Sequence, residues 1–142
     1  MATTTATVSI SSSDLIPGSA LNINASTTCM KAGLTTGLEL MEMGNGKLLT
    51  GDASKSLQTL PTAAGNDGAS KLYLCNNATD DTYYIDVDVH DQNMGRLYAG
   101  DWMFIPWSMT DTVAQIVIEA EGGTCPYEYA VFKEGETLVA HS

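Results

Sequence analysis

Asp86, Asp88 and His90 are the residues in this sequence whose types and spacing come closest to a metal site. A β-strand places residues two positions apart side by side on one face. Carboxylate oxygens and an imidazole nitrogen in that arrangement are suitable ligands for a divalent cation. A solvated strand face has the same pattern, and an EF-hand loop would need a glycine and a distant glutamate at positions where this sequence has neither. We therefore expect no bound metal or other cofactor, and these three residues are the candidates if a cation binds.

This chain has few residues that could support histidine-dependent catalysis. His90 and His141 are the two histidines, and His141 lies one residue from the end of the sequence, where fraying is usual. No Gly-x-Ser-x-Gly motif and no nearby cysteine accompany His90. Paired carboxylates such as Asp86 and Asp88 are common in acidic proteins, and a small sandwich leaves little surface for the cleft of a glycosidase. We expect no enzymatic activity.

The strongest candidates for binding are four aromatic residues, Tyr98, Trp102, Phe104 and Trp107. If 102–107 is a strand, its two alternating sets of side chains are both apolar, so each face needs a cover. Tryptophan and tyrosine dominate buried interface anchors, and they also stack against sugar rings. Three alternatives follow: the aromatic side chains fill the core of the domain, bind a partner subunit or bind a carbohydrate.

A sheet must position these residues, and the turns of the second half indicate one. From residue 71 onwards turn-forming residues recur every 8 to 12 positions or so, as in antiparallel sandwiches. The predicted strands are Lys71 to Asn76, Thr82 to Val89, Met94 to Tyr98, Trp102 to Trp107, Val113 to Ala120 and Tyr127 to Lys133. Three apolar stripes predict an inner layer: Tyr83, Ile85, Val87 and Val89; Ala114, Ile116, Ile118 and Ala120; Tyr127, Tyr129 and Val131.

The first half of the sequence gives weaker indications of strands and turns. Residues 1–13 are mostly Ala, Thr and Ser, with Val8 and Ile10 as anchors, and they predict an extended arm that orders by pairing with another strand. Pro17-Gly18 marks a turn, and Leu21 to Ala25 alternates as a half-buried strand does. Gly44-Asn45-Gly46 predicts the turn of a hairpin whose arms are 38–43 and 47–50. The predicted fold is an all-β, antiparallel β-sandwich or jelly-roll-like domain over 14–142, preceded by the arm.

The composition and net charge narrow the classes of partner that the protein could bind. The 142 residues suffice for one domain with a real core. A formal net charge of −11 repels phosphate backbones and anionic lipids, so nucleic acid and membrane are poor partners. Three cysteines without a close pair, and no basic and apolar leader, are typical of a protein made in a reducing cytoplasm.

Several segments between residues 71 and 133 carry a resemblance to a known class of protein. A strand ends in Asn at Lys71 to Asn77, a Gly-x-Leu-x-x-Gly-Asp turn spans 95–101, and an apolar Phe-Ile-Pro strand follows. The other matching segments are Tyr83 to Val87, Ile116 to Ala120 and Tyr127 to Phe132. Together they resemble small β-sandwich virion proteins of tailed bacteriophages, over less than half of the chain. The shared motifs are structural turns, not catalytic signatures.

The resemblance implies a capsid decoration or cement protein, or a minor tail or neck component. Such a protein is made in the host cytoplasm and lies on the outer capsid surface, where it binds the major capsid protein or another virion protein. A homo-oligomer, such as a trimer, fits this role. The expected contacts are Val8 and Ile10 in the arm, with Tyr98 and the 102–107 strand. A carbohydrate-binding or host-recognition module is the alternative, and it would need exposed aromatic residues and a cation site near Asp86.

Overall fold

The computed structural model describes residues 4–29, 38–50, 55–56, 68–89, 92–108 and 116–137. Within these ranges the chain forms ten β-strands and no helix, and every strand pair is antiparallel, which confirms the all-β prediction. In this part of the chain there is accordingly no helix long and apolar enough to cross a membrane. The chain divides into two units, Met1–Leu38 and Glu39–Ser142. The predicted boundary after residue 13 falls inside the first strand.

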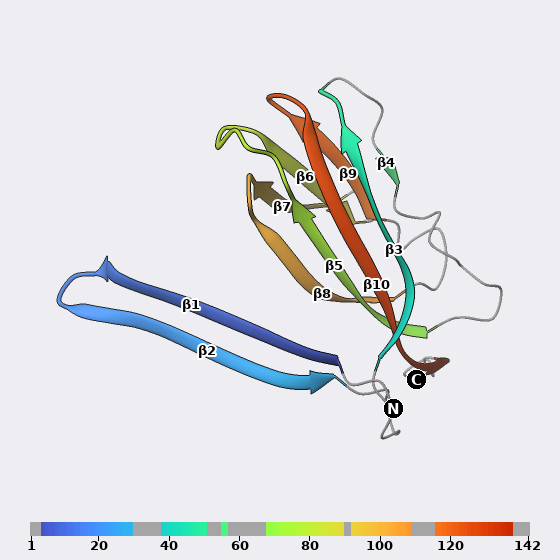
Figure 1. Ribbon diagram of the computed structural model, residues 1–142, viewed down its shortest axis with the longest axis horizontal. Helices are drawn as coiled ribbons and strands as arrows, with labels where there is room; N and C mark the ends of the chain where they lie inside the picture. The colour runs from blue at the N-terminus through green and yellow to red at the C-terminus, as the bar shows by residue number, and fades with distance from the viewer. Residues whose placement is uncertain are drawn as a thin grey trace. The chain divides into compact units, whose positions relative to one another are not determined.

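The first unit is a long two-stranded hairpin (Figure 1). Strand β1 (Thr4–Ile16) pairs with β2 (Ser19–Cys29) through the predicted Pro17-Gly18 turn, where Gly18 has a φ of 76°. That positive φ is accessible to glycine at no steric cost. The residues predicted to form an extended arm therefore belong to β1, and they pair with a strand of their own chain.

The second unit contains two four-stranded sheets. One has the strand order β3-β10-β5-β8 and the other β4-β9-β6-β7, and Figure 1 shows them as two layers, one behind the other. The strands of the first sheet are β3 (Glu39–Leu48), β10 (Cys125–Thr137), β5 (Gly68–Asn76) and β8 (Trp102–Ser108). Those of the second are β4 (Lys55–Ser56), β9 (Ile116–Glu121), β6 (Tyr84–Val89) and β7 (Gln92–Tyr98).

The pairing scheme explains how this order arises. β6 pairs with β7, β5 with β8, β4 with β9 and β3 with β10, so the eight strands form one long antiparallel ribbon that is folded at the β6–β7 connection. Two lateral pairs, β10 with β5 and β9 with β6, roll this ribbon up into two sheets. This is the strand order of an eight-stranded jelly roll, an architecture that viral capsid and lectin domains share.

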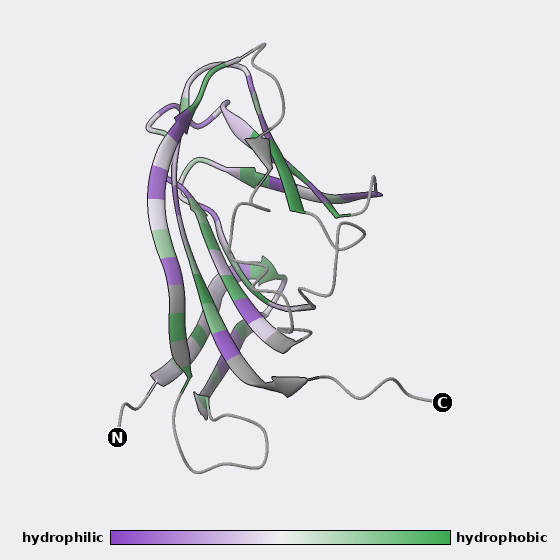
Figure 2. Ribbon diagram, turned by 90° about the vertical axis from the view of Figure 1, so that its right-hand side faces the viewer, coloured by the Kyte–Doolittle hydropathy of each residue, from purple (hydrophilic) through white to green (hydrophobic). Residues whose placement is uncertain are grey.

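The core lies between the two sheets and uses the predicted stripes. Ile85, Ile116, Ile118 and Val131 are fully buried in it, and Tyr127 is 2% exposed. Green and purple bands along the strands in Figure 2 show the alternation that directs these residues inward. Of the predicted stripes, Ala114 lies outside the described residues. The three cysteines, Cys29, Cys75 and Cys125, are buried and free.

The predicted hairpin at Gly44-Asn45-Gly46 is wrong, because β3 runs straight through these residues. Gly44 and Gly46 lie opposite Tyr129 and Tyr127 of β10, and the tyrosine rings cover the glycine backbone. A Cβ at Gly46 would lie 2.8 Å from the Tyr127 hydroxyl oxygen. The glycines are therefore needed for close packing of the rings on the strand, and not for a turn.

Asn76 joins the ends of three strands and is fully buried. Its Nδ2 donates to the Leu97 carbonyl at 2.8 Å, and its Oδ1 accepts from the Ala78 backbone N–H at 2.9 Å. The backbone of Asn76 also bonds to the Gly100 N–H and to the Asp101 carbonyl, so the β7–β8 turn is fixed to the end of β5. The strand-ending Asn and the Gly-Asp turn noted in the sequence thus form one structural unit.

Candidate functional site

The outward side of the sheet β3-β10-β5-β8 presents an unusually apolar surface. The strand register places three rows of side chains there: Leu40, Phe132, Lys71 and Pro106; Met43, Ala130, Tyr73 and Phe104; Asn45, Glu128, Cys75 and Trp102. Nine of these twelve residues are apolar or aromatic. We call this surface the outer apolar face. Its inward counterpart is the core itself, so this sheet is apolar on both sides.

Large side chains of the outer apolar face are open to solvent at its two edges. Met43 is 69% exposed and Leu40 51% exposed on edge strand β3, and Trp102 is 48% exposed on edge strand β8. The middle of the face is better covered, since Phe104 and Phe132 meet edge to face with ring centroids 6.4 Å apart. A partner that covered the whole face would bury the exposed edges without displacing this central pair.

Tyr73 and Glu128 form the polar centre of the face. The Tyr73 hydroxyl donates to Glu128 Oε1 at 3.0 Å, and a shallow hollow beside the pair is lined by Met43, Asn45 and Ala130. Burial, with hydrogen bonds to Cys75 and Glu128, raises the pKa of Tyr73 above its usual range. The Tyr73 hydroxyl therefore remains neutral at physiological pH, and because its single O–H is donated to Glu128, its oxygen offers a partner a hydrogen-bond acceptor in addition to apolar contact.

The outward side of the other sheet has the opposite character. Its outward positions carry four half-buried carboxylates, Asp86, Asp88, Glu119 and Glu121. Arg96 bonds to Asp86 through Nε at 3.1 Å, and its guanidinium carbon lies 4.3 Å from the centroid of the Tyr84 ring. We call this side the acidic face. The two outward faces of the jelly roll are thus apolar and acidic respectively.

The four predicted aromatic residues do not form one cluster. Trp102 and Phe104 lie on the outer apolar face, whereas Trp107 points inward and is 9% exposed in the core. Tyr98 is on β7 in the other sheet, where its ring contacts Tyr84 with centroids 5.3 Å apart. Alternation along β8 separates the two tryptophans, because they are an odd number of residues apart. Strand β8 was predicted to be covered on both sides. Within the chain the core covers its inward side, and Trp102 on its outward side is exposed.

The candidate cation ligands behave as ordinary strand residues where they are described. Asp86 is paired with Arg96, as given above, and Asp88 lies opposite Asn93 and Val117 in the strand register. His90 lies outside the described residues. Among the described residues no group of three or more histidines, cysteines or carboxylates is placed to hold a metal ion.

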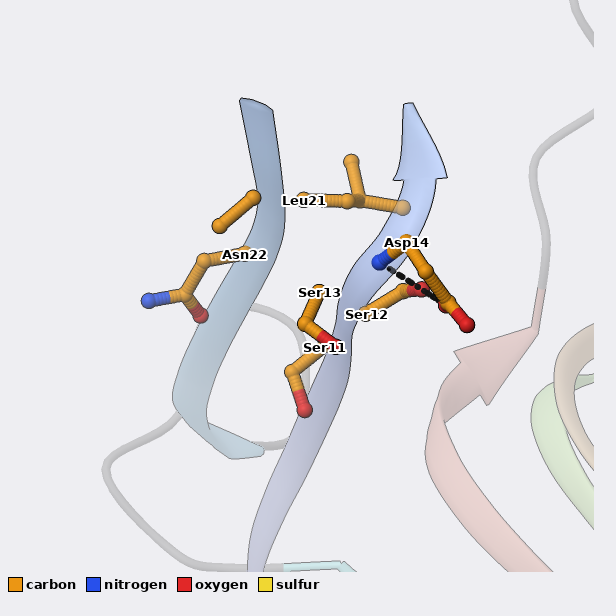
Figure 3. A pocket seen from close by; sticks show the side chains of 7 residues that line it. Ser11, Ser12, Ser13, Asp14, Leu21 and Asn22 are labelled. Atoms are coloured by element: carbon orange, nitrogen blue, oxygen red, sulfur yellow. Dashed lines mark hydrogen bonds between the residues drawn. The ribbon is translucent and has the colours of Figure 1, made fainter. Parts of the chain in front are cut away.

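Val8 and Ile10, the predicted contacts of the arm, lie on one face of the hairpin and are 36% and 49% exposed. Near the hairpin turn is a shallow hollow lined by serines, Asp14, Leu21 and Asn22 (Figure 3). There the Ser12 hydroxyl donates to Asp14 Oδ1 at 2.9 Å and accepts from the Leu15 backbone N–H at 3.0 Å. These bonds stabilise a β-bulge between Ser12 and Ile16, and they give the hollow a structural role.

Most of the outer apolar face was missed by the sequence predictions, which assigned only Trp102, Phe104 and Pro106 of its nine apolar residues to a partner contact. Leu40 and Met43 were assigned to a hairpin arm, in which regular alternation would place them on opposite faces. The register shift between Leu40 and Glu42 places both on the outward side. Phe132 and Tyr73 had a detectable signal, because both β10 and β5 carry apolar residues at consecutive positions. A strand that is apolar at consecutive positions is apolar on both faces, as was recognised only for residues 102–107.

A scan against models of known protein families finds no match to this chain, and a search of curated proteins also finds none.

Proposed function

We propose that this chain is a structural virion protein of a tailed bacteriophage, a capsid decoration protein that binds the assembled shell and stabilises it. The observation that carries the proposal is the outer apolar face on a strongly acidic chain. Four strands about 4.8 Å apart and three rows about 6.8 Å apart give this face an area of roughly 400 Å². The largest apolar patch on a typical soluble monomer has about this size, and it is often a functional surface.

Two further features support a shell as the partner. The jelly-roll strand order is common among viral capsid proteins, and the turn motifs of residues 71–133 resemble those of small virion proteins. The acidic face is on the opposite side of the jelly roll, so it would point into solvent when the outer apolar face is bound. Its charge would then keep decorated particles from associating with one another.

The mechanism is stabilisation by mass action. A protein that binds the assembled shell but not free subunits lowers the free energy of the shell by RT ln(1 + [L]/Kd), where [L] is its free concentration. Contacts that span adjacent capsomers would hold them together against internal pressure. No catalytic step is required, and the residues that act are those of the outer apolar face.

The test is co-sedimentation of the purified protein with phage shells that lack it, and with the unassembled shell protein. We expect saturable binding to shells, a higher temperature of genome release from decorated particles, and no binding to unassembled subunits. Absence of binding to shells, or equal binding to free subunits, would overturn the proposal.

A carbohydrate-binding module is the second candidate, favoured by the exposure of Trp102 and by the occurrence of jelly rolls among lectins. It predicts binding to a glycan array that does not require shells. Loss of that binding with a chelator would indicate a cation site near Asp86.

A further inference from the structure

Glu128 is the one carboxylate among the twelve residues of the outer apolar face. It lies on β10, an inner strand of its sheet, directly opposite Asn45 of β3 and Cys75 of β5. Its position is therefore inside the face and not at an open edge of the sheet. A partner that covers the outer apolar face must cover this carboxylate as well.

Bonds within the chain satisfy only part of the Glu128 carboxylate. The Tyr73 hydroxyl donates to Oε1 at 3.0 Å, whereas an ionised carboxylate has about four lone-pair sites. Lys47 lies on the same side of the sheet, two residues beyond Asn45 on β3, but no ion pair joins it to Glu128. Covering Glu128 with a purely apolar surface would remove water from a charge that has no counter-charge, which is unfavourable.

The hollow beside Glu128 has an apolar part and a polar part. It encloses about 270 Å³ and extends over two rows of the strand register. Met43 and Ala130 belong to the first row, and Asn45 and Glu128 belong to the second. Three groups near the second row can accept a hydrogen bond: the carboxylate, the amide oxygen of Asn45 and the hydroxyl oxygen of Tyr73.

A long basic side chain is complementary to both parts of the hollow. Lysine and arginine have an aliphatic stem, which can lie against Met43 and Ala130, and a cationic head that only donates hydrogen bonds. The head would then reach the acceptors of the second row. An apolar side chain would fill the first row but leave Glu128 unpaired, and an acidic side chain would be repelled.

We propose that a lysine or arginine side chain of the shell protein inserts into this hollow and pairs with Glu128. The inference rests on the proposed function, because it names the group that the shell offers to the outer apolar face. A carboxylate inside an otherwise apolar surface also disfavours apolar partners that lack a cation. Glu128 thus contributes specificity, and the surrounding apolar residues contribute contact area.

The test measures the affinity of variants for shells in the co-sedimentation assay. Glu128→Gln keeps the size of the side chain and removes its charge. We expect it to bind at least about tenfold more weakly than wild type, because the basic group of the shell would be buried without its partner. Glu128→Met makes the face more apolar, and it should also bind more weakly. The matched control is Glu119→Gln on the acidic face, which should bind within about twofold of wild type.

Two results at position 128 would overturn this inference and leave the proposed function standing. Tighter binding by Glu128→Met would show that the occupant of the hollow is apolar, and unchanged binding by Glu128→Gln would show that it is neutral. Glu128 is exposed, so both variants should keep the circular dichroism spectrum and the unfolding temperature of wild type.

Lys47→Gln tests whether the chain supplies its own counter-charge to Glu128. We expect this variant to bind shells at least as tightly as wild type. A loss equal to that of Glu128→Gln would assign the pairing to Lys47 and overturn the inference. Failure of the wild-type protein to bind shells is a different result, because it would overturn the proposed function and this inference with it.

Discussion

Asn76 illustrates how a single buried amide can fix the geometry of a loop. It is fully buried, and its side chain satisfies the Leu97 carbonyl and the Ala78 N–H. Asn76→Ala would leave both groups without these partners, so we expect it to lower the free energy of unfolding by about 2–4 kcal/mol. Urea denaturation followed by tryptophan fluorescence measures this loss. Asn93→Ala, at an exposed position of β7, is the control, and it should change stability by less than about 0.5 kcal/mol. Equal effects of the two substitutions would contradict the role given to Asn76.

Tyr129 gives the protein a specific sensitivity to alkaline pH. Its hydroxyl donates to Glu42 Oε1 at 2.6 Å, and burial together with this bond raises the pKa of Tyr129 to about 12, from 10.0. Because the folded state holds the proton more tightly than the unfolded state, the resulting stabilisation is complete below pH 10.0 and is lost as the pH rises towards about 12.

We therefore expect the urea midpoint to fall between pH 10 and pH 12, in step with tyrosinate absorbance. Tyr129→Phe should be less stable than wild type at pH 8 and should lose less stability over the alkaline range. If the variant and wild type lost stability in parallel, another group would be responsible.

At the scale of elements, β8 combines two roles in seven residues. Trp107 packs in the core, and Trp102 lies on the outer apolar face. We expect Trp107→Ala to cost about 3–5 kcal/mol of stability, as large-to-small core substitutions do. Trp102→Ala should cost less than about 1 kcal/mol. Thermal unfolding followed by circular dichroism measures both, and equal costs would contradict the assignment of the two faces.

Strands were predicted correctly from the sequence where apolar residues alternate regularly. The prediction failed where glycines serve close packing of side chains and were taken for a turn. The stripes containing Ile85, Ile116 and Val131 are buried as predicted. Gly44 and Gly46 were misread, because a glycine under an aromatic ring and a glycine in a turn look the same along the sequence. The pairing of β5 with β10 and of β6 with β9 could not be predicted, since these contacts depend on how the ribbon rolls up and not on local pattern.

Prediction of the candidate site, the outer apolar face, was limited in the same way. Trp102 and Phe104 were predicted to contact a partner, but Leu40, Met43 and Phe132 join them through strand neighbours that are distant in sequence. Pro106 carried a further signal, because proline in a strand is confined mainly to sheet edges, and β8 is an edge strand. Which residues share a face across several strands is fixed by the register and not by composition.

At the scale of the whole molecule, the outer apolar face offers a modest contact area. An apolar face of roughly 400 Å² is about half of what each partner buries in a standard interface, so a single copy would bind a shell weakly.

The most direct test of the outer apolar face as the binding surface compares two triple variants in the shell co-sedimentation assay. Leu40→Ser, Met43→Ser and Trp102→Ser replace its three most exposed large side chains. Asp88→Ser, Glu119→Ser and Glu121→Ser make the same number of changes on the acidic face. We expect the first variant to bind at least about tenfold more weakly than wild type, a difference of about 1.4 kcal/mol, and the second to bind within about twofold of it. Wild-type affinity in the first variant, or an equal loss in the second, would contradict the assignment.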